Sequence, residues 1–169
     1  MPESVATGAG STTDPSGWPA GYQMKLTIVL SRPRAKKYLR PYMAVWIEDA
    51  AGTPIRILSV WSKRKKRKYL KDLRVFWRFA RKDRDTYEAV SRATRGPGRY
   101  RLVWNGLDDQ GHAVPRGKYT VHVEVAREKG THQHLSAAVT CGSVPVRKQM
   151  GRNIEINGVT LTYGPAGLK

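Results

Sequence analysis

The chain has 169 residues, of which 40% are hydrophobic and 26% are charged, a composition typical of one globular domain and not of a disordered segment. Its 31 lysines and arginines outnumber 13 acidic residues and give a formal net charge of +18, which favours a polyanionic partner: nucleic acid, anionic lipid, an acidic protein or a phosphorylated cofactor. The lone Cys141 excludes an intrachain disulfide, and no apolar run approaches the roughly 20 residues of a membrane span.

Residues 1–22 predict a flexible tail ahead of a single domain over 23–169. The tail is dominated by Gly, Ser, Thr, Ala and Pro and buries too little apolar surface to offset the entropy of ordering it. It also lacks the basic region and the apolar core of a secretory signal. From the residues alone, three interpretations of location stay open: the cytoplasm, an incomplete or processed precursor, or another export route.

Most of the domain alternates apolar and polar residues with a period of two, which predicts strands. The expected strands cover 23–30, 42–48, 55–61, 99–104 and 119–125, with two short ones on either side of Asn157-Gly158. The segment 42–48 is apolar on both faces and is typical of a central strand. Turn residues at 51–54 predict one hairpin, and Asn157-Gly158 predicts another.

Residues 69–81 break this pattern, because their apolar side chains recur every three or four positions and so predict an amphipathic helix. Together these elements predict a mostly β fold, an antiparallel immunoglobulin-like β-sandwich with one helix-bearing insertion over 63–84. Phe76 and Trp77 are interpreted as packing residues of that helix in preference to a stacking platform for a flat cofactor. The other tryptophans expected in the core are Trp46, Trp61 and Trp104.

Charge is concentrated in residues 63–84, which hold twelve basic and two acidic side chains. The candidate partner-binding residues are Lys63, Arg64, Lys65, Lys66, Arg67, Lys68, Arg74 and Arg78. The run carries no paired zinc ligands, ribonucleoprotein motif or helix-turn-helix spacing, so nucleic acid is the less favoured partner. An acidic protein, a membrane-associated complex or an anionic lipid surface is favoured over it, and a solvated loop without a polyanionic partner is the remaining interpretation.

Two histidines and two aspartates are candidate metal ligands. His132 and His134 are two residues apart, so in a strand they share a face, but exposed strand histidines without a metal are the simpler interpretation. Asp108 and Asp109 lack the alternate oxygen ligands of a calcium loop and are expected to hydrogen-bond within a turn. No catalytic spacing is present, so we expect no enzyme and no metal site.

Five stretches carry a family resemblance: RPYMAVWIED, YLKDLRVFWR, SRATRGPGRYRLVWNGLDDQG, VPRGKYTVHVEVAREKGTHQ and GRNIEINGVTLTYGP. In this order they resemble the domain of unknown function 2271 family of predicted periplasmic bacterial proteins, over about 23–169. The resemblance implies a periplasmic, sandwich-like module without established enzymatic activity, found beside membrane flavin reductases. It outweighs the missing export signal and favours the periplasm. Residues 104–119 are also similar to a hairpin of immunoglobulin-like domains in flagellar hook-capping proteins.

Many family members carry a stretch similar to the site where a transferase attaches FMN to a threonine through its phosphate. Thr94 stands at the acceptor position here, Ser91 matches the pattern, and Arg92 replaces a glycine. The resemblance therefore implies Ser91, Arg92, Thr94 and Arg95 as cofactor-binding residues of an electron-transfer accessory. Arg92 speaks against this role, because glycine permits a close backbone approach that a side chain blocks. A protein without a cofactor is the preferred interpretation, with an FMN carrier as the alternative.

Overall fold

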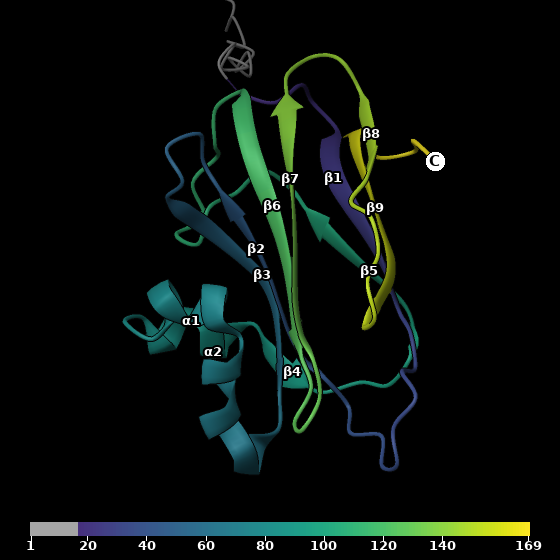
Figure 1. The fold of residues 1–169 in the computed structure, drawn as a ribbon. Helices are drawn as coiled ribbons and strands as arrows, with labels where there is room; N and C mark the ends of the chain where they lie inside the picture. Colours follow the sequence, from purple (N-terminus) through teal and green to yellow (C-terminus); the bar gives the residue numbers. More distant parts are fainter. Residues whose placement is uncertain (1–16) are drawn as a thin grey trace, which may run out of the picture.

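Two β-sheets face each other in the computed structural model, which describes residues 17–169 (Figure 1). The strands are β1 (Tyr22–Leu30), β2 (Tyr42–Glu48), β3 (Pro54–Ser62), β4 (Ser91–Ala93), β5 (Gly98–Trp104), β6 (Gly117–Ala126), β7 (His132–Cys141), β8 (Val146–Gln149) and β9 (Ile156–Pro165). One sheet has the order β5-β1-β9-β8 and the other the order β4-β3-β2-β6-β7. All pairings are antiparallel except β3 with β4. This confirms the predicted mostly β sandwich.

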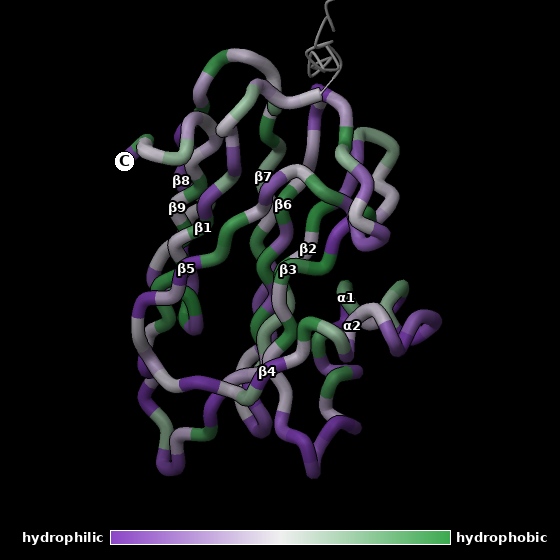
Figure 2. Tube along the Cα trace, turned by 180° about the vertical axis from the view of Figure 1, so that it is seen from behind, coloured by the Kyte–Doolittle hydropathy of each residue, from purple (hydrophilic) through white to green (hydrophobic). Residues whose placement is uncertain are grey.

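The main core lies between the sheets and is built by the predicted alternation. In β1, Met24, Leu26 and Ile28 are fully buried, whereas the intervening side chains face outward. The same core encloses Trp104 and Cys141, both almost completely buried. Burial raises the pKa of the Cys141 thiol to about 12. Figure 2 shows hydrophobic residues along β2, β3 and β6, and hydrophilic and hydrophobic stretches in turn along the helical segment beside them.

The helical segment is an insertion between β3 and β4, residues 63–90, that packs on the outer face of the five-stranded sheet (Figure 1). It contains a 3-10 helix, η1 (Arg64–Asp72), followed by α1 (Arg74–Ala80) and α2 (Arg84–Ala89). Its buried apolar side chains form a second core with residues of β2 and β3; they are Leu70, Leu73, Phe76, Ala80 and Tyr87. The second core explains why β2 is apolar on both faces, as the sequence predicted.

The insertion differs from the single helix predicted over 69–81. Leu73 has ψ of 76°, outside the helical range, and separates η1 from α1. Glu124 on β6 accepts hydrogen bonds from the backbone amides of Val75 and Phe76, at 2.9 and 2.8 Å, and thereby caps α1 in the middle of the predicted helix. Leu70 and Leu73, on the two sides of the break, both face the same sheet, and for this reason the apolar side chains keep a helical spacing in the sequence.

The hairpin predicted at Asn157-Gly158 is wrong. Both residues lie within β9, where Val29 of β1 pairs with Gly158 and Leu30 pairs with Ile156. Asn157 is therefore the extra residue of a β-bulge. The turn that joins β8 to β9 lies earlier and includes Gly151, with φ of +84°, a conformation that favours glycine.

The predicted tail over 1–22 includes six residues that the structure places on the body. Gly17 forms a bridge with Pro115, and Trp18 packs edge-on against Trp104 and Tyr163, with ring centroids 4.8 and 4.9 Å apart. Tyr22 already begins β1. The rest of the predicted tail, residues 1–16, lies outside the described residues.

Candidate functional site

The predicted partner-binding cations all lie on the insertion, but they fall into two groups. In the first group, Lys63 and Lys66 form ion pairs with Glu128 in the turn between β6 and β7, at 3.4 and 3.1 Å. Arg67 pairs with Glu88 of α2, which also accepts a hydrogen bond of 2.7 Å from Arg84. Lys66 and Arg84 hold the pKa of their respective carboxyl partners below the usual value. These pairs attach the insertion to itself and to the sheet.

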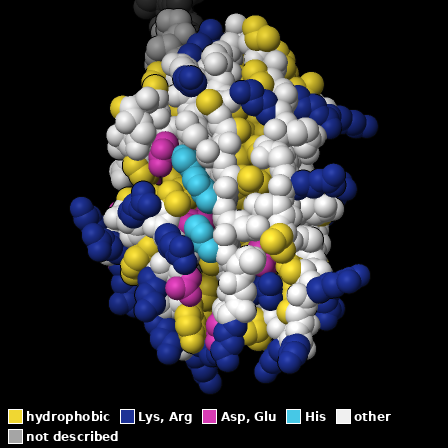
Figure 3. Space-filling view, viewed as in Figure 1, with side chains coloured by type: hydrophobic (Ala, Val, Ile, Leu, Met, Phe, Trp, Pro, Cys, Tyr) yellow, Lys and Arg dark blue, Asp and Glu magenta, His cyan; other side chains and the backbone are white. Residues whose placement is uncertain are grey.

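The second group of cations is exposed and not ion-paired within residues 17–169, so it is accessible to a partner. Five of the predicted residues are exposed and make no ion pair within residues 17–169, and three further cations of the insertion share this property. The eight residues are Arg64, Lys65, Lys68, Arg74 and Arg78, with Lys71, Arg81 and Lys82 in addition. Figure 3 shows many lysine and arginine side chains over the helical side of the molecule. We call these eight residues the basic face.

Glu124 fixes the insertion that carries the basic face. Its side chain is fully buried, and its two carboxylate oxygens accept the two amides of α1 described above. His132 of β7 completes the arrangement, with Nε2 at 2.5 Å from Glu124 Oε1. A carboxylate at this end of a helix also interacts favourably with the helix dipole. The insertion is therefore held by a buried polar contact as well as by its apolar core.

A row of histidines crosses the sheet next to the insertion (Figure 3). His122 Nδ1 lies 2.9 Å from His134 Nε2, and both rings lie nearly parallel to the indole of Trp46. His122 Nε2 is 3.0 Å from a carboxylate oxygen of Glu48, but the geometry does not make a hydrogen bond. Burial and the neighbouring His122 lower the pKa of His134.

The predicted shared face of His132 and His134 is confirmed, but both are half-buried and contact β6, so they are not simply exposed. Within residues 17–169 no three His, Cys, Asp or Glu side chains form a group that could hold a metal ion.

The residues matched to the FMN acceptor motif do not converge. Thr94 has only 8% of its surface exposed, and Ser91 donates from its hydroxyl to the carbonyl of Tyr87. Arg92 and Arg95 line a pocket of about 290 Å³ between β3 and β5, which neither Thr94 nor Ser91 lines. The two arginines therefore point to a different place from the threonine that would carry the cofactor.

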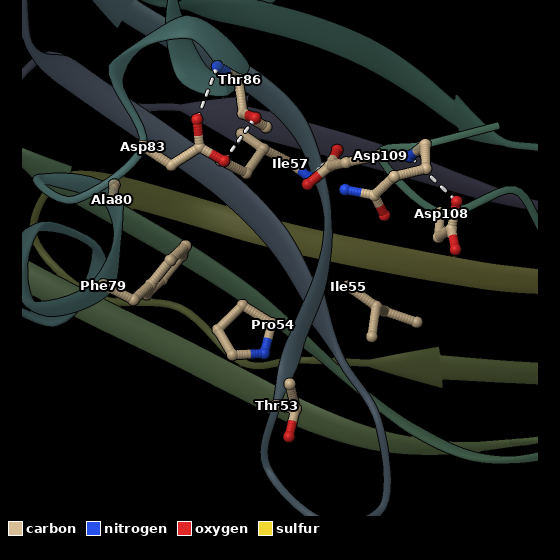
Figure 4. Close-up of a pocket in the computed structure, with 11 residues that line it drawn as sticks. Thr53, Pro54, Ile55, Ile57, Phe79, Ala80, Asp83, Thr86, Asp108 and Asp109 are labelled. Atoms are coloured by element: carbon tan, nitrogen blue, oxygen red, sulfur yellow. Dashed lines mark hydrogen bonds between the residues drawn. The ribbon is translucent and has the colours of Figure 1, made fainter.

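A second pocket, of about 330 Å³, lies between the start of β3, the end of α1 and the loop after β5 (Figure 4). Its carboxylates already serve the backbone: Asp83 accepts from the amide of Thr86, and Asp109 accepts from the amide of Ile57 at 3.0 Å. Burial raises the pKa of Asp109. Asp108 makes the predicted turn hydrogen bonds, to the amides of residues 110 and 112, which lower its pKa. The carboxylates of this pocket thus have structural partners.

Sequence reasoning found the cations but not their acidic partners. Glu128 lies 62 residues from Lys66 along the chain and follows β6 in a short charged turn. No spacing in the sequence relates it to the insertion. Glu124, which caps α1, likewise lies about fifty residues from the amides that it accepts, and no local pattern in the sequence indicates that role.

Comparison with known proteins gave one finding. A family model described as "Predicted periplasmic protein (DUF2271)" matches residues 23–157, which is most of the chain. No curated protein and no solved structure matches significantly. Among the helices within residues 17–169, none has both the length and the apolar character required to cross a membrane.

Proposed function

The chain belongs to the DUF2271 family of predicted periplasmic proteins, and from this premise we propose that it is a non-catalytic docking subunit of the periplasm. Its basic face binds an acidic protein, such as a subunit of a membrane-associated complex. The observation that carries the proposal is the set of eight exposed cations without ion-pair partners within residues 17–169, gathered on one anchored insertion.

The anchoring of the insertion supports a docking role. A flexible loop loses conformational entropy when it binds, whereas a surface already held in place avoids much of that cost. Here the second core, Glu124 and the ion pairs with Glu128 hold the basic face before any partner arrives. Exposed charges at the rim of an interface raise the association rate and select an acidic partner. A rigid basic face is therefore suited to recognition of a complementary acidic surface.

The remaining alternatives have weaker support. Thr94, the residue that would carry FMN, is nearly buried and lies off the pocket of Arg92 and Arg95. A nucleic-acid binder gains affinity from base stacking on exposed aromatic side chains. The large aromatic side chains of the insertion instead pack inward, with Phe76 fully buried and Trp77 in contact with Tyr87.

The proposal is tested with four glutamine substitutions on the basic face, R64Q/K65Q/K68Q/K71Q. Binding to poly-L-glutamate is measured by fluorescence anisotropy over a range of salt concentrations. Because four exposed charge contacts contribute a few tenths of a kcal/mol or more each, we expect the Kd to rise by about tenfold. The salt dependence of binding should also become shallower.

The matched control neutralises four exposed cations outside the insertion, R34Q/K36Q/K37Q/R40Q, and so makes the same change in net charge. We expect it to change the Kd by less than about twofold, because weak surface charges far from a contact are screened. Equal effects of both variants would mean that net charge alone drives binding and would refute the basic face. Tight binding to anionic vesicles or duplex DNA, without binding to poly-L-glutamate, would refute an acidic protein as the partner. The partner would then be a membrane surface or a nucleic acid.

A further inference from the structure

Strand β5 leaves an edge of its sheet open. It pairs with β1 on one side, and within residues 17–169 no backbone hydrogen bond reaches its other side. The other sheet ends are β4 with three residues, β8 with four and β7 with ten, and on β7 the ammonium group of Lys148 donates to the carbonyl of Ala138. The seven residues of β5 therefore present an unpaired edge, longer than the other end strand of the same sheet, β8, in the described part of the chain.

A basic groove of about 710 Å³ lies on the outer face of β5 and its neighbours. Arg99 and Arg101 project into it from alternate positions of β5, with Lys25 of β1 and Arg147 of β8 beside them. The four strands of this sheet contain no aspartate or glutamate, so these cations have no acidic neighbour in the strands. The groove therefore favours acidic side chains.

A pocket of about 290 Å³ lies on the inner side of β5, where the sandwich is open toward β3. It is lined by Tyr100 and Leu102 of β5 and by Leu58 and Trp61 of β3. Arg95 lies over the rings of Trp61 and Tyr100, 5.6 Å from each centroid. Arg92, Arg95 and Arg101 also line the pocket, which therefore combines an apolar and aromatic wall with three guanidinium groups.

We propose that the β5 edge binds an extended peptide segment of a partner, which adds to the sheet as a further strand. Side chains of a strand point alternately to its two faces, so an added strand would place one set over the basic groove and the other over the inner pocket, against its wall of Trp61, Tyr100 and Leu102. The fitting segment alternates acidic with apolar residues. Arg101 and Leu102 line both hollows, which places the two hollows on either side of the same strand edge. This site is separate from the basic face and does not depend on it.

Charge disfavours a second copy of the chain as the occupant. Antiparallel pairing of two β5 strands around a twofold axis would bring Arg99 and Arg101 of one copy close to the same residues of the other. Like charges on directly opposed or diagonal positions of paired strands are destabilising. An acidic strand from a different protein reverses the sign of these contacts.

The test uses an eight-residue peptide in which glutamate alternates with valine, labelled for fluorescence anisotropy. The comparison peptides have the same composition in two blocks, or lysine in place of glutamate. We expect the alternating acidic peptide to bind at least tenfold more tightly than either, and the amide hydrogens of β5 to exchange more slowly when it is bound. Equal binding of the blocked and alternating peptides would overturn the proposal.

Two further measurements separate strand addition from simple charge attraction. Only alternate amides of an added strand point to β5, so N-methylation of one alternate set should abolish binding while methylation of the other set preserves it. Equal effects of the two patterns refute strand addition. The variant R99E/R101E should lose at least tenfold in affinity, and the charge-matched control K36E/K37E should not. The variant R64Q/K65Q/K68Q/K71Q should bind the alternating peptide as tightly as the wild type, because the β5 edge is separate from the basic face. Loss of peptide binding in this variant would place the peptide on the insertion and refute the β5 site.

Discussion

At the scale of single residues, the most informative groups are the buried polar ones beside Trp46. Glu124 satisfies two backbone amides and one imidazole, and His122 contacts both His134 and Glu48. Buried polar groups lower the stability of a protein unless they find hydrogen-bond partners. Glu124 and Nδ1 of His122 have such partners, whereas Nε2 of His122 makes no hydrogen bond within residues 17–169. These contacts connect the insertion to the face of the sheet that carries it.

His134 makes the stability of the fold depend on pH. Its pKa is lowered by burial and by His122, while the carboxylates of Glu48 and Glu124 oppose the shift. The unfolded chain therefore binds a proton more readily than the folded one, and stability is lost as the pH falls below the ordinary histidine pKa of about 6.5. We expect the thermal midpoint to drop between pH 7.5 and 5.5, and to drop less in His134→Gln. Identical pH profiles of the two proteins would contradict this assignment.

At the scale of elements, the insertion is an attachment to the sandwich and depends on contacts with it. Its apolar residues cover β2 and β3, and at the start of α1 the side-chain cap comes from Glu124, since the N-cap residue Leu73 makes no such bond. The short helices would be marginal alone, because isolated helices of this length do not form stably in water. Their order must come from the sheet.

Removal of the cap should loosen the insertion before the sandwich. Glu124→Ala leaves two buried amides without an acceptor, which we expect to cost about 2–4 kcal/mol of local stability. Limited digestion with trypsin measures this well, since the insertion is rich in lysine and arginine: cleavage within 63–84 should be faster in the variant. Glu128→Ala, which removes the ion-pair partner of Lys63 and Lys66, should raise the cleavage rate less. Equal protection of wild type and Glu124→Ala would show that apolar packing alone orders the insertion.

The elements also show which features the sequence could predict. The alternation of β1 and the two-sided apolar pattern of β2 were sufficient, because burial alone defines those strands. The break at Leu73 was not visible, because Glu124, about fifty residues away, decides where α1 begins. Asn157-Gly158 has the local chemistry of a turn, but pairing with β1 makes it a bulge. Strand β7 is not predicted, because its sequence HQHLSAAVTC does not alternate strictly between apolar and polar residues.

The candidate site was predictable to a similar degree. Clustered cations are a local property of the sequence, so the basic face could be placed on residues 63–84. The division between paired and unpaired cations could not, because it depends on Glu128 and Glu88, which only the tertiary structure brings near. The two hollows beside β5 likewise arise from the pairing of strands distant in the chain.

At the scale of the whole molecule, charge is both large and unevenly distributed. The net charge is +18, and none of the acidic residues lies in β1, β5, β8 or β9. Cations therefore lie on the outer faces of both sheets, on the insertion over one and in the groove on the other. The molecule has two separate places at which it favours an acidic partner.

The same charge should oppose folding. Repulsion among like charges destabilises a compact state, and salt screens it. We expect the thermal midpoint to rise as sodium chloride is raised from low to moderate concentration, by roughly 2–4 °C for each ~1 kcal/mol of repulsion relieved. The variant R64Q/K65Q/K68Q/K71Q should show a smaller rise. A midpoint that falls with salt would mean that ion pairs such as Lys66–Glu128 outweigh the repulsion.

The position of Cys141 has a consequence for the compartment in which the family is placed. The periplasm is oxidising, and a reactive thiol there is open to disulfide exchange with other proteins. Cys141 is fully enclosed in the main core, and its thiol stays protonated because burial raises its pKa to about 12. Thiolate is the attacking species in such exchange, so this chain can carry a single cysteine among oxidants without becoming cross-linked to its neighbours.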